Sequence, residues 1–332
     1  MVTRDRCRGA LLGLAVGDAM GAPTEGMTPE AIHAAHGRVE GFLHTRASGT
    51  DDTEYAVLCA QGLLAHGRRL TSNDVAAVWT RAVLSQEGGF HGAGFSEMGA
   101  IANLRAGVAP PVSGNDNHES WSDGAAMRVA PIGILCAGDP AEAARLARED
   151  AQVSHAADGI YGAQAIAAAV ARALVTDDHT EVIAAGLAAV AEDTWTARLL
   201  RRALDVASHA STMAEAEREL YRRIPLFHYP WPDSAPEAVA LSFGLFAAAE
   251  GAFIPSVVSA VNIGRDSDTI AAMAGAMAGA LHGDAAIPPA WRTKVRQVSG
   301  VCVTATAGTD LVELADALYE ASQGNEEYEN AI

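Results

Sequence analysis

Apolar residues recur at helical spacing along almost the whole chain, and this periodicity constrains the fold more than any other feature of the sequence. Ala and Leu dominate the periodic segments, and none of them shows the sustained alternation of apolar and polar residues that marks a half-buried strand. Because only 5% of the residues are aromatic, the core must consist largely of small aliphatic side chains, which let helices approach each other closely. The sequence therefore predicts an all-α fold.

The expected helices begin at residues that favour helix starts, such as the cap at Thr71 and the proline at Pro140. Residues 106–123 contain several glycines and prolines and show no helical period, so we expect a functional loop there. No linker, charge block or fixed-period repeat divides the chain, and we therefore predict one domain over residues 1–332. The predicted helices span residues 7–19, 52–65, 72–84, 96–105, 140–151, 158–174, 182–191, 194–208, 213–223, 236–249, 254–261, 267–281 and 289–321, the last with a break near residues 300–308.

The chain is strongly acidic, with a formal net charge of -18 from 41 acidic and 23 basic residues. Binding to a polyanion by counterion release requires a basic face, and no block of Lys or Arg supplies one, so nucleic acid is not an expected partner. A small phosphorylated ligand remains compatible with this charge, because backbone amides at helix starts and bound cations provide local positive potential.

The four cysteines are far apart and form neither a CxxC pair nor a disulfide framework, which favours a reducing, cytoplasmic setting. The apolar N-terminal segment is interrupted by Asp18 and has no clear cleavage site, so we interpret it as a helix of the mature protein. The longest apolar stretch, residues 270–281, is much shorter than the roughly 20 residues that a membrane span needs. A soluble protein without a membrane partner is expected.

Two short acidic segments stand directly before apolar helices, at residues 48–54 (SGTDDTE) and 264–269 (GRDSDT). Asp, Ser and Thr are favoured helix caps, and capping is the simplest interpretation of each segment. A helix start needs about one capping oxygen, however, whereas each segment supplies two carboxylates within three residues, whose repulsion must be offset. A hard divalent cation bound by oxygen ligands offsets it.

The two segments together offer six oxygen-bearing side chains for such cations. Asp266 and Asp268 are two residues apart in a loop that leads into a helix, so both can converge on one point. The set suits two Mg²⁺ or Mn²⁺ ions, whereas zinc is disfavoured because no Cys or paired His accompanies either segment. The candidate metal ligands are Thr50, Asp51, Asp52, Asp266, Asp268 and Thr269.

Two further carboxylates near the N-terminus are open to two interpretations each. Asp18 lies near the end of an otherwise apolar helix, where burial is costly without a partner, so it either bonds a backbone turn or helps to shape a site. Glu25 follows Pro23 in a loop and is either a solvated surface charge or part of the same site.

Five segments, taken in order, resemble the ADP-ribosylglycohydrolases, a family that includes the dinitrogenase-reductase-activating glycohydrolases and the ADP-ribosyl-acceptor hydrolases. Any one of the segments is weak, but five in family order between residues 9 and 283 are a strong resemblance. They are GALLGLAVGDAMGAPTE, SGTDDTEYAVL, SDGAAMRVAPIGIL, VSHAADGIYGAQAIAAAV and VNIGRDSDTIAAMAGAMAGALHG.

The resemblance implies a compact orthogonal bundle of helices with two Mg²⁺ or Mn²⁺ ions in a cleft. The family's Thr-Asp-Asp and Asp-x-Asp-Thr ligand motifs fall on the six candidate ligands named above, and Glu25 falls where some members place a carboxylate near the metals. Met127 in the same region is expected in the core. The residues matched to ribose, diphosphate and substrate binding are Asp123, Gly124, Ser154 and His155, although His155 could equally be a satisfied histidine at a helix start.

Two features depart from the family pattern or stand outside it. Arg265 and Ser267 occupy variable positions of the second metal motif, and Arg265 could reach a substrate phosphate or form a surface salt bridge. Residues 227–233 (FHYPWPD) are unusually aromatic for this chain and form either a packed connector or a wall on which an adenine stacks, with Tyr229 as a substrate-binding candidate.

The implied activity is metal-dependent hydrolysis of an N-glycosidic bond that removes ADP-ribose from arginine or another acceptor, on a protein or a small-molecule ADP-riboside. The reaction passes through an oxocarbenium-like state and needs a water whose proton is taken up, and Asp52, Asp266 and Glu25 are the catalytic candidates. Two alternatives are hydrolysis of a free small-molecule N-riboside and a catalytically silent ADP-ribose-binding protein. The silent protein is disfavoured because it has no need of six metal-binding side chains. The sequence leaves the acceptor, the physiological metal and the oligomeric state open.

Overall fold

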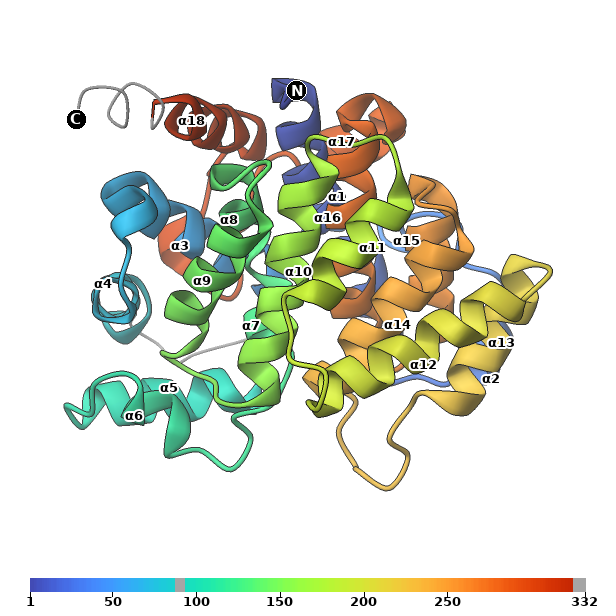
Figure 1. The fold of residues 1–332 in the computed structure, drawn as a ribbon, viewed down its shortest axis with the longest axis horizontal. Coiled ribbons are helices and arrows are strands. Elements are labelled where there is room, and N and C mark those ends of the chain that lie inside the picture. The colour runs from blue at the N-terminus through green and yellow to red at the C-terminus, as the bar shows by residue number, and fades with distance from the viewer. Residues whose placement is uncertain (87–92, 325–332) are drawn as a thin grey trace.

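The computed structural model describes residues 1–86 and 93–324, and within them the regular structure is helical apart from two isolated bridges. This confirms the predicted all-α fold (Figure 1). The α-helices are α1 (Arg4–Gly21), α2 (Pro29–His36), α3 (Asp51–His66), α4 (Ser72–Trp79), α5 (Phe95–Arg105), α6 (Val112–Asn115), α7 (Gly124–Met127), α8 (Ala130–Leu135), α9 (Pro140–Ala151), α10 (Asp158–Ala173), α11 (His179–Ala188), α12 (Trp195–His209), α13 (Met213–Arg223), α14 (Ala235–Ala248), α15 (Phe253–Ile263), α16 (Ser267–His282), α17 (Pro289–Val295) and α18 (Leu311–Gln323). Short 3-10 turns lie at Ala22–Thr24, Gly67–Arg69, Asp284–Ala286 and Thr304–Thr306, and a π-helical turn at Thr80–Leu84 extends α4.

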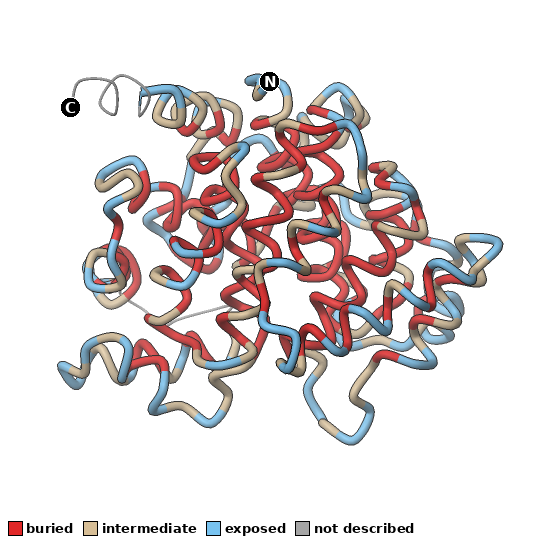
Figure 2. Tube along the Cα trace, viewed as in Figure 1, coloured by how far each residue is buried: buried red, intermediate tan, exposed pale blue. Residues whose placement is uncertain are grey.

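Helices α1 and α16 form the centre of the bundle, although their sequences lie at opposite ends of the chain. Their backbones touch along a line of small residues: a Cβ atom added to Gly13 would lie 2.2 Å from the carbonyl oxygen of Gly275, and one added to Gly9 would lie 2.2 Å from that of Gly279. Both helices are almost entirely buried, and Figure 2 shows this burial along the middle of the molecule. The small side chains that the composition indicated are therefore concentrated where two helices meet backbone to backbone.

This pairing is antiparallel and brings the end of α1 beside the start of α16. Near the crossing, a Cβ atom on Gly21 would lie 2.4 Å from the Cα atom of Asp268. Asp18, in the last turn of α1, is therefore held close to the first turn of α16.

The start of α3 is fixed by a distant segment. The buried carboxylate of Glu54 accepts hydrogen bonds from the backbone N–H groups of Val301 (2.8 Å) and Cys302 (2.9 Å) and from the hydroxyl of Ser299 (3.1 Å). Glu54 therefore satisfies the loop that precedes α18 and attaches it to the first turn of α3.

The predicted helices agree closely with the structure where the amphipathic pattern is long. The bounds of α9 and α13 are as predicted, whereas α2 and the short helices α6, α7 and α8 were not expected. Residues 106–123 thus contain a helical turn in the stretch expected to be a loop, and the break between α17 and α18 is longer than predicted. A helix of one turn carries too few residues to show a period, and its formation depends on tertiary contacts. Within the described residues, no helix has the length and apolar character needed to cross a membrane.

The contact between α1 and α16 predicts a sharp response to one added methyl group. Gly13→Ala should destabilise the protein by about 1–3 kcal/mol or more, because the new atom meets backbone that cannot yield easily. Gly62→Ala is the matched control, since a Cβ atom there would lie 3.4 Å from its nearest neighbour, Leu70, and alanine is favoured over glycine inside a helix by up to about 1 kcal/mol. Chemical denaturation of both variants checks this, and equal stabilities would contradict the backbone contact.

Candidate functional site

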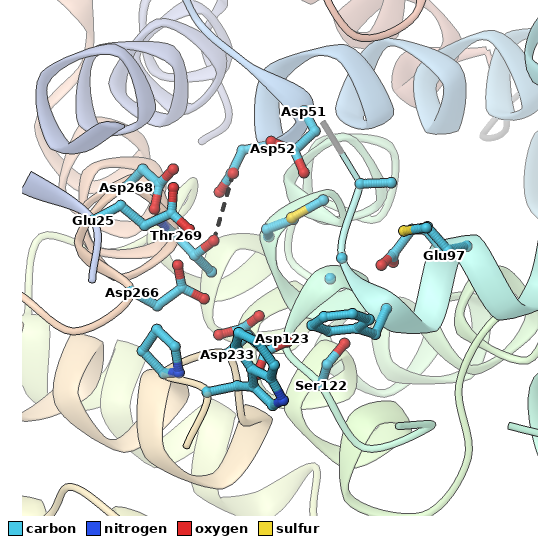
Figure 3. Close-up of a pocket in the computed structure, with 18 residues that line it drawn as sticks. Glu25, Asp51, Asp52, Glu97, Ser122, Asp123, Asp233, Asp266, Asp268 and Thr269 are labelled. Atoms are coloured by element: carbon cyan, nitrogen blue, oxygen red, sulfur yellow. Dashed lines mark hydrogen bonds between the residues drawn. The ribbon is translucent and has the colours of Figure 1, made fainter. Parts of the chain in front are cut away.

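A cavity of about 330 Å³ lies where α3, α5, α7 and α16 begin. Figure 3 shows its carboxylates converging from segments that are far apart in the sequence. The lining is predominantly acidic, with no Lys, Arg or His side chain among the described residues that form it. The lining residues are Glu25, Asp51, Asp52, Ala93, Gly94, Phe95, Glu97, Met98, Ser122, Asp123, Gly124, Met127, Trp231, Pro232, Asp233, Asp266, Asp268 and Thr269.

Asp18 joins the cavity to the helix pairing behind it. Its buried carboxylate accepts hydrogen bonds from the backbone N–H groups of Thr50 (2.8 Å) and Thr53 (3.0 Å) and from the hydroxyl of Thr50 (2.6 Å). These donors lie at the first turn of α3, so Asp18 acts as a cap supplied by another helix. The first interpretation of Asp18 from the sequence is therefore confirmed, because it bonds a backbone turn, whereas its part in a functional site stays a prediction.

Two groups of carboxylates bring oxygen atoms within 4.8 Å of one another, one formed by Asp18, Asp52 and Asp268 and the other by Glu25, Asp266 and Asp268. Asp268 belongs to both. Among the described residues, Oδ1 of Asp52 is buried and has no hydrogen-bond partner, which is costly unless another group, such as a cation, satisfies it. The donor set is all oxygen, so the two groups could hold hard divalent cations such as Mg²⁺ or Mn²⁺.

The remaining predicted ligands lie at the edge of these groups. Asp51 and Thr269 line the cavity, and the Thr269 hydroxyl approaches Oδ2 of Asp52 at 3.5 Å (Figure 3). Thr50 is half-buried and donates its hydroxyl proton to Asp18, which leaves an oxygen lone pair for a cation. The structure thus gathers five of the predicted ligands at the cavity wall or in its carboxylate groups and places Thr50 directly behind them. Their role as ligands stays a prediction.

Burial and mutual repulsion raise the pKa of the clustered carboxyl groups. For Asp52, Asp266 and Asp268 burial is the largest cause, and neighbouring carboxylates add to it, so each pKa lies well above its ordinary value. The pKa of Glu25 is also raised, by burial first and then by Asp51 and Asp233. Bound cations reverse this effect, because a nearby positive charge favours the carboxylate form.

The predicted substrate-binding residues separate into two sets. Asp123 and Gly124 line the cavity, and Oδ2 of Asp123 has no hydrogen-bond partner among the described residues. Ser154 and His155 are buried behind the wall, where Nε2 of His155 lies 3.0 Å from the hydroxyl of Ser122, which does line the cavity. Ser154 and His155 therefore do not line this cavity themselves and lie behind the lining residues Ser122 and Glu97.

The aromatic segment also contributes differently from the expectation. Tyr229 does not line the cavity; its hydroxyl donates to Glu119, and its ring packs on Trp121 with a centroid distance of 4.8 Å. Trp231, in the same segment, lines the cavity and packs on Phe95 with a centroid distance of 4.9 Å. The rings of Phe95 and Trp231 remain partly exposed, and together they form an aromatic surface at the cavity.

Of the two interpretations of Arg265, the structure shows the salt bridge. Its Nε atom lies 2.5 Å from Oε1 of the buried Glu237, and its guanidinium also lies over the ring of Phe227. The φ angle of +61° at Arg265, together with the preceding Gly264 at +67°, turns the chain sharply into α16. Arg265 therefore braces this turn and does not line the cavity.

Sequence reasoning missed Phe95, Glu97 and Asp233 as lining residues. Phe95 and Glu97 lie in the first turn of α5, in a segment without the density of carboxylates that identified the two metal motifs. Asp233 was visible only as the end of the aromatic segment. The only sequence signal for Glu97 was its position as an acidic residue at the start of a predicted helix.

Comparisons with known proteins agree with this architecture. A sequence model of the family described as ADP-ribosylglycohydrolase matches residues 1–328. A protein of Archaeoglobus fulgidus is 33% identical over 299 residues, covering 86% of this chain and 90% of that protein. An ADP-ribosylarginine hydrolase of Pseudomonas putida is 28% identical over 302 residues, covering 88% of this chain and 74% of that protein. A solved ADP-ribosylglycohydrolase-related protein complex matches with a TM-score of 0.69 and 27% identity over 96% of this chain and 98% of that chain. With a family match that spans nearly its whole length and a matching fold, the chain belongs to the ADP-ribosylglycohydrolase family.

Proposed function

We propose that the protein is a dinuclear-metal-dependent hydrolase that cleaves the N-glycosidic bond between ADP-ribose and an acceptor, with arginine as the preferred acceptor. The observation that carries the proposal is the pair of carboxylate groups that share Asp268 on one side of the cavity. Membership of the family and similarity to an ADP-ribosylarginine hydrolase support the choice of substrate.

The two carboxylate groups would each hold one Mg²⁺ or Mn²⁺ ion. When bound, such cations supply positive charge that orients ribose hydroxyls and makes a water molecule more acidic. The chain's own residues position the groups: Asp18 is hydrogen-bonded to the start of α3, and Asp268, in the first turn of α16, belongs to both groups. Asp52, Asp266 and Glu25 are the carboxylates placed to accept the proton that the attacking water loses.

The rest of the cavity suits an ADP-ribosyl group attached to a cation. Phe95 and Trp231 offer an aromatic face for the adenine. Asp233, which lies outside the two groups, favours a positively charged guanidinium acceptor.

Loss of the shared carboxylate should abolish two-ion binding. Asp268→Asn removes one negative charge from both groups with little change of shape, so calorimetric titration with Mn²⁺ should fall from two ions to at most one. Release of ADP-ribose from ADP-ribosyl-arginine should fall by at least ~10²-fold. Asp205→Asn, on the exposed surface of α12, is the control and should titrate as the wild type does. Unchanged binding of two ions by Asp268→Asn would rule out the assignment.

The cation-free protein should lose stability as the pH rises. A carboxyl group whose pKa is higher in the folded than in the unfolded state binds more protons when folded, so the free energy of unfolding falls as pH rises between the two values. For Asp233 this window runs from 3.8 to about 6, and for Glu97 from 4.5 to about 7. In calorimetric scans with a chelator, Tm should therefore fall between about pH 4 and about pH 7, and Mn²⁺ should raise Tm more at the higher pH. A Tm that is independent of pH and of Mn²⁺ would contradict the site.

Binding of ADP-ribose should depend on the aromatic surface at the cavity and only weakly on salt. Trp231→Ala should weaken ADP-ribose binding by ~1–3 kcal/mol, because an adenine loses its stacking partner. Tyr229→Ala is the matched comparison from the same segment and should have the smaller effect, since its ring does not line the cavity. Titration of ADP-ribose and ribose at low and high salt decides between substrates: equal affinity for both would favour a hydrolase of free N-ribosides.

A further inference from the structure

The cavity contains a carboxyl group that belongs to neither of the two metal-binding groups. Glu97 lies in the first turn of α5, is completely buried and lines the cavity. Oε1 of Glu97 accepts a hydrogen bond of 3.1 Å from Nη1 of Arg128, whereas its Oε2 has no hydrogen-bond partner among the described residues. Figure 3 shows Glu97 across the cavity from Glu25, Asp266 and Asp268.

We propose that Glu97 is the general acid that protonates the departing acceptor, a role that rests on the proposed function. Glycoside hydrolysis uses carboxyl groups on opposite sides of the sugar, one for the leaving group and one for the incoming water. The carboxylates around Asp268 lie on one side of the cavity, so Glu97 is placed for the other.

Arg128 makes this role possible because its charge is already balanced by another residue. Its Nε atom donates to Oδ1 of Asp150 at 2.7 Å, and its Nη2 atom donates to the hydroxyl of Ser154 at 3.1 Å. Arg128 and Asp150 are both buried and form a neutral pair. Glu97 is therefore the second carboxyl group that contacts the guanidinium of Arg128. When Glu97 is protonated, the buried network of Arg128, Asp150 and Glu97 is neutral. When Glu97 is ionised, the network carries one negative charge that no group in it balances.

The groups around Glu97 act in opposite directions on its ionisation. Burial raises the pKa of Glu97 to about 7, with Arg128 opposing this change and Asp51 and Asp233 adding to it. Nε2 of His155 lies 3.8 Å from Oε1 of Glu97, but burial holds the pKa of His155 well below its ordinary value, so His155 is neutral and adds no second positive charge. The titratable and charged groups facing Glu97 are Tyr55, Arg128, His155, Asp51, Asp123 and Asp233.

The proposed step conserves protons and electrons. The bond between the anomeric carbon and the acceptor nitrogen breaks, and its electron pair goes to the nitrogen, which takes the proton of Glu97. The water oxygen bonds to the anomeric carbon and gives a proton to a carboxylate on the side of Asp268. Exchange with solvent then returns that carboxylate to its ionised form and Glu97 to its protonated form, so one water is consumed for each bond cleaved.

Substrates with different leaving groups test this role. The departing guanidine is a strong base and takes up a proton as the bond breaks, whereas a pyridine is a weak base and departs unprotonated from a pyridinium N-riboside. In the Mn²⁺-loaded protein, Glu97→Gln should lower kcat/KM for ADP-ribosyl-arginine by at least ~10²-fold. The same variant should change kcat/KM for a pyridinium ADP-riboside of the same anomeric configuration by no more than about threefold.

The wild-type pH profile gives a second test. The kcat/KM for the arginine substrate should fall as pH rises through about 7, because Glu97 loses its proton. The kcat/KM for the pyridinium substrate should not show this fall.

Glu237→Gln is the matched control, because Glu237 is also buried and paired with an arginine but does not line the cavity. Any effect of Glu237→Gln should be equal for the two substrates. Equal losses for both substrates in Glu97→Gln, or turnover at the wild-type rate, would overturn the role of Glu97 while leaving the proposed function intact. Failure of the wild type to cleave either substrate would overturn the proposed function itself. If Glu97→Gln does not fold, the wild-type pH profiles test the role of Glu97. The same fall of kcat/KM above about pH 7 with both substrates would overturn that role.

Discussion

The backbone contact between α1 and α16 is the constraint on which the rest of the structure depends. Glycines on both helices remove the side chains that would otherwise keep the axes apart, and the antiparallel crossing then brings Asp18 beside Asp268. Neither residue is near the other in the sequence. A pair of helices separated by ordinary side chains would place these carboxylates farther apart, so the close packing is a condition of the site as well as of stability.

Asp18 links the packing of the helices to the candidate site. Its carboxylate receives the N–H groups at the start of α3, which no side chain of α3 itself caps, and so fixes the helix that carries Asp51 and Asp52. Glu54 fixes the same turn from the other side by holding the loop at Val301 and Cys302. The first turn of α3 is thus tied to both ends of the chain, and two adjacent aspartates are kept at a position where they repel their neighbours.

The parts of the site that sequence could predict are those in which function is concentrated in a few consecutive residues. Asp51 and Asp52, and Asp266 and Asp268, were identified because paired carboxylates at a helix start exceed what capping requires. Glu97 could not be identified in this way, because its significance arises from Arg128 and Asp150, which lie in two other helical regions. The same limit applies to the fold: long amphipathic helices such as α9 and α13 were predicted, whereas the one-turn helix α7, which begins at the cavity, depends on its neighbours.

Charge balance in the cavity connects the metal groups with the choice of acceptor. Eight carboxyl groups line the cavity, and no basic side chain among the described residues does so. Two divalent cations would balance four negative charges, and burial raises the pKa of Glu97 to about 7, so that this group is only partly ionised at neutral pH. Asp233, whose pKa is raised only to about 6, is ionised at pH 7, and Arg265 is the positive charge that acts on it. A guanidinium acceptor would add a positive charge near this half-buried carboxylate, which a neutral acceptor cannot do, and the rings of Phe95 and Trp231 can pack against either kind of acceptor. Under the proposed function, the charge of the lining therefore supports arginine over an uncharged acceptor, and this support is independent of sequence similarity.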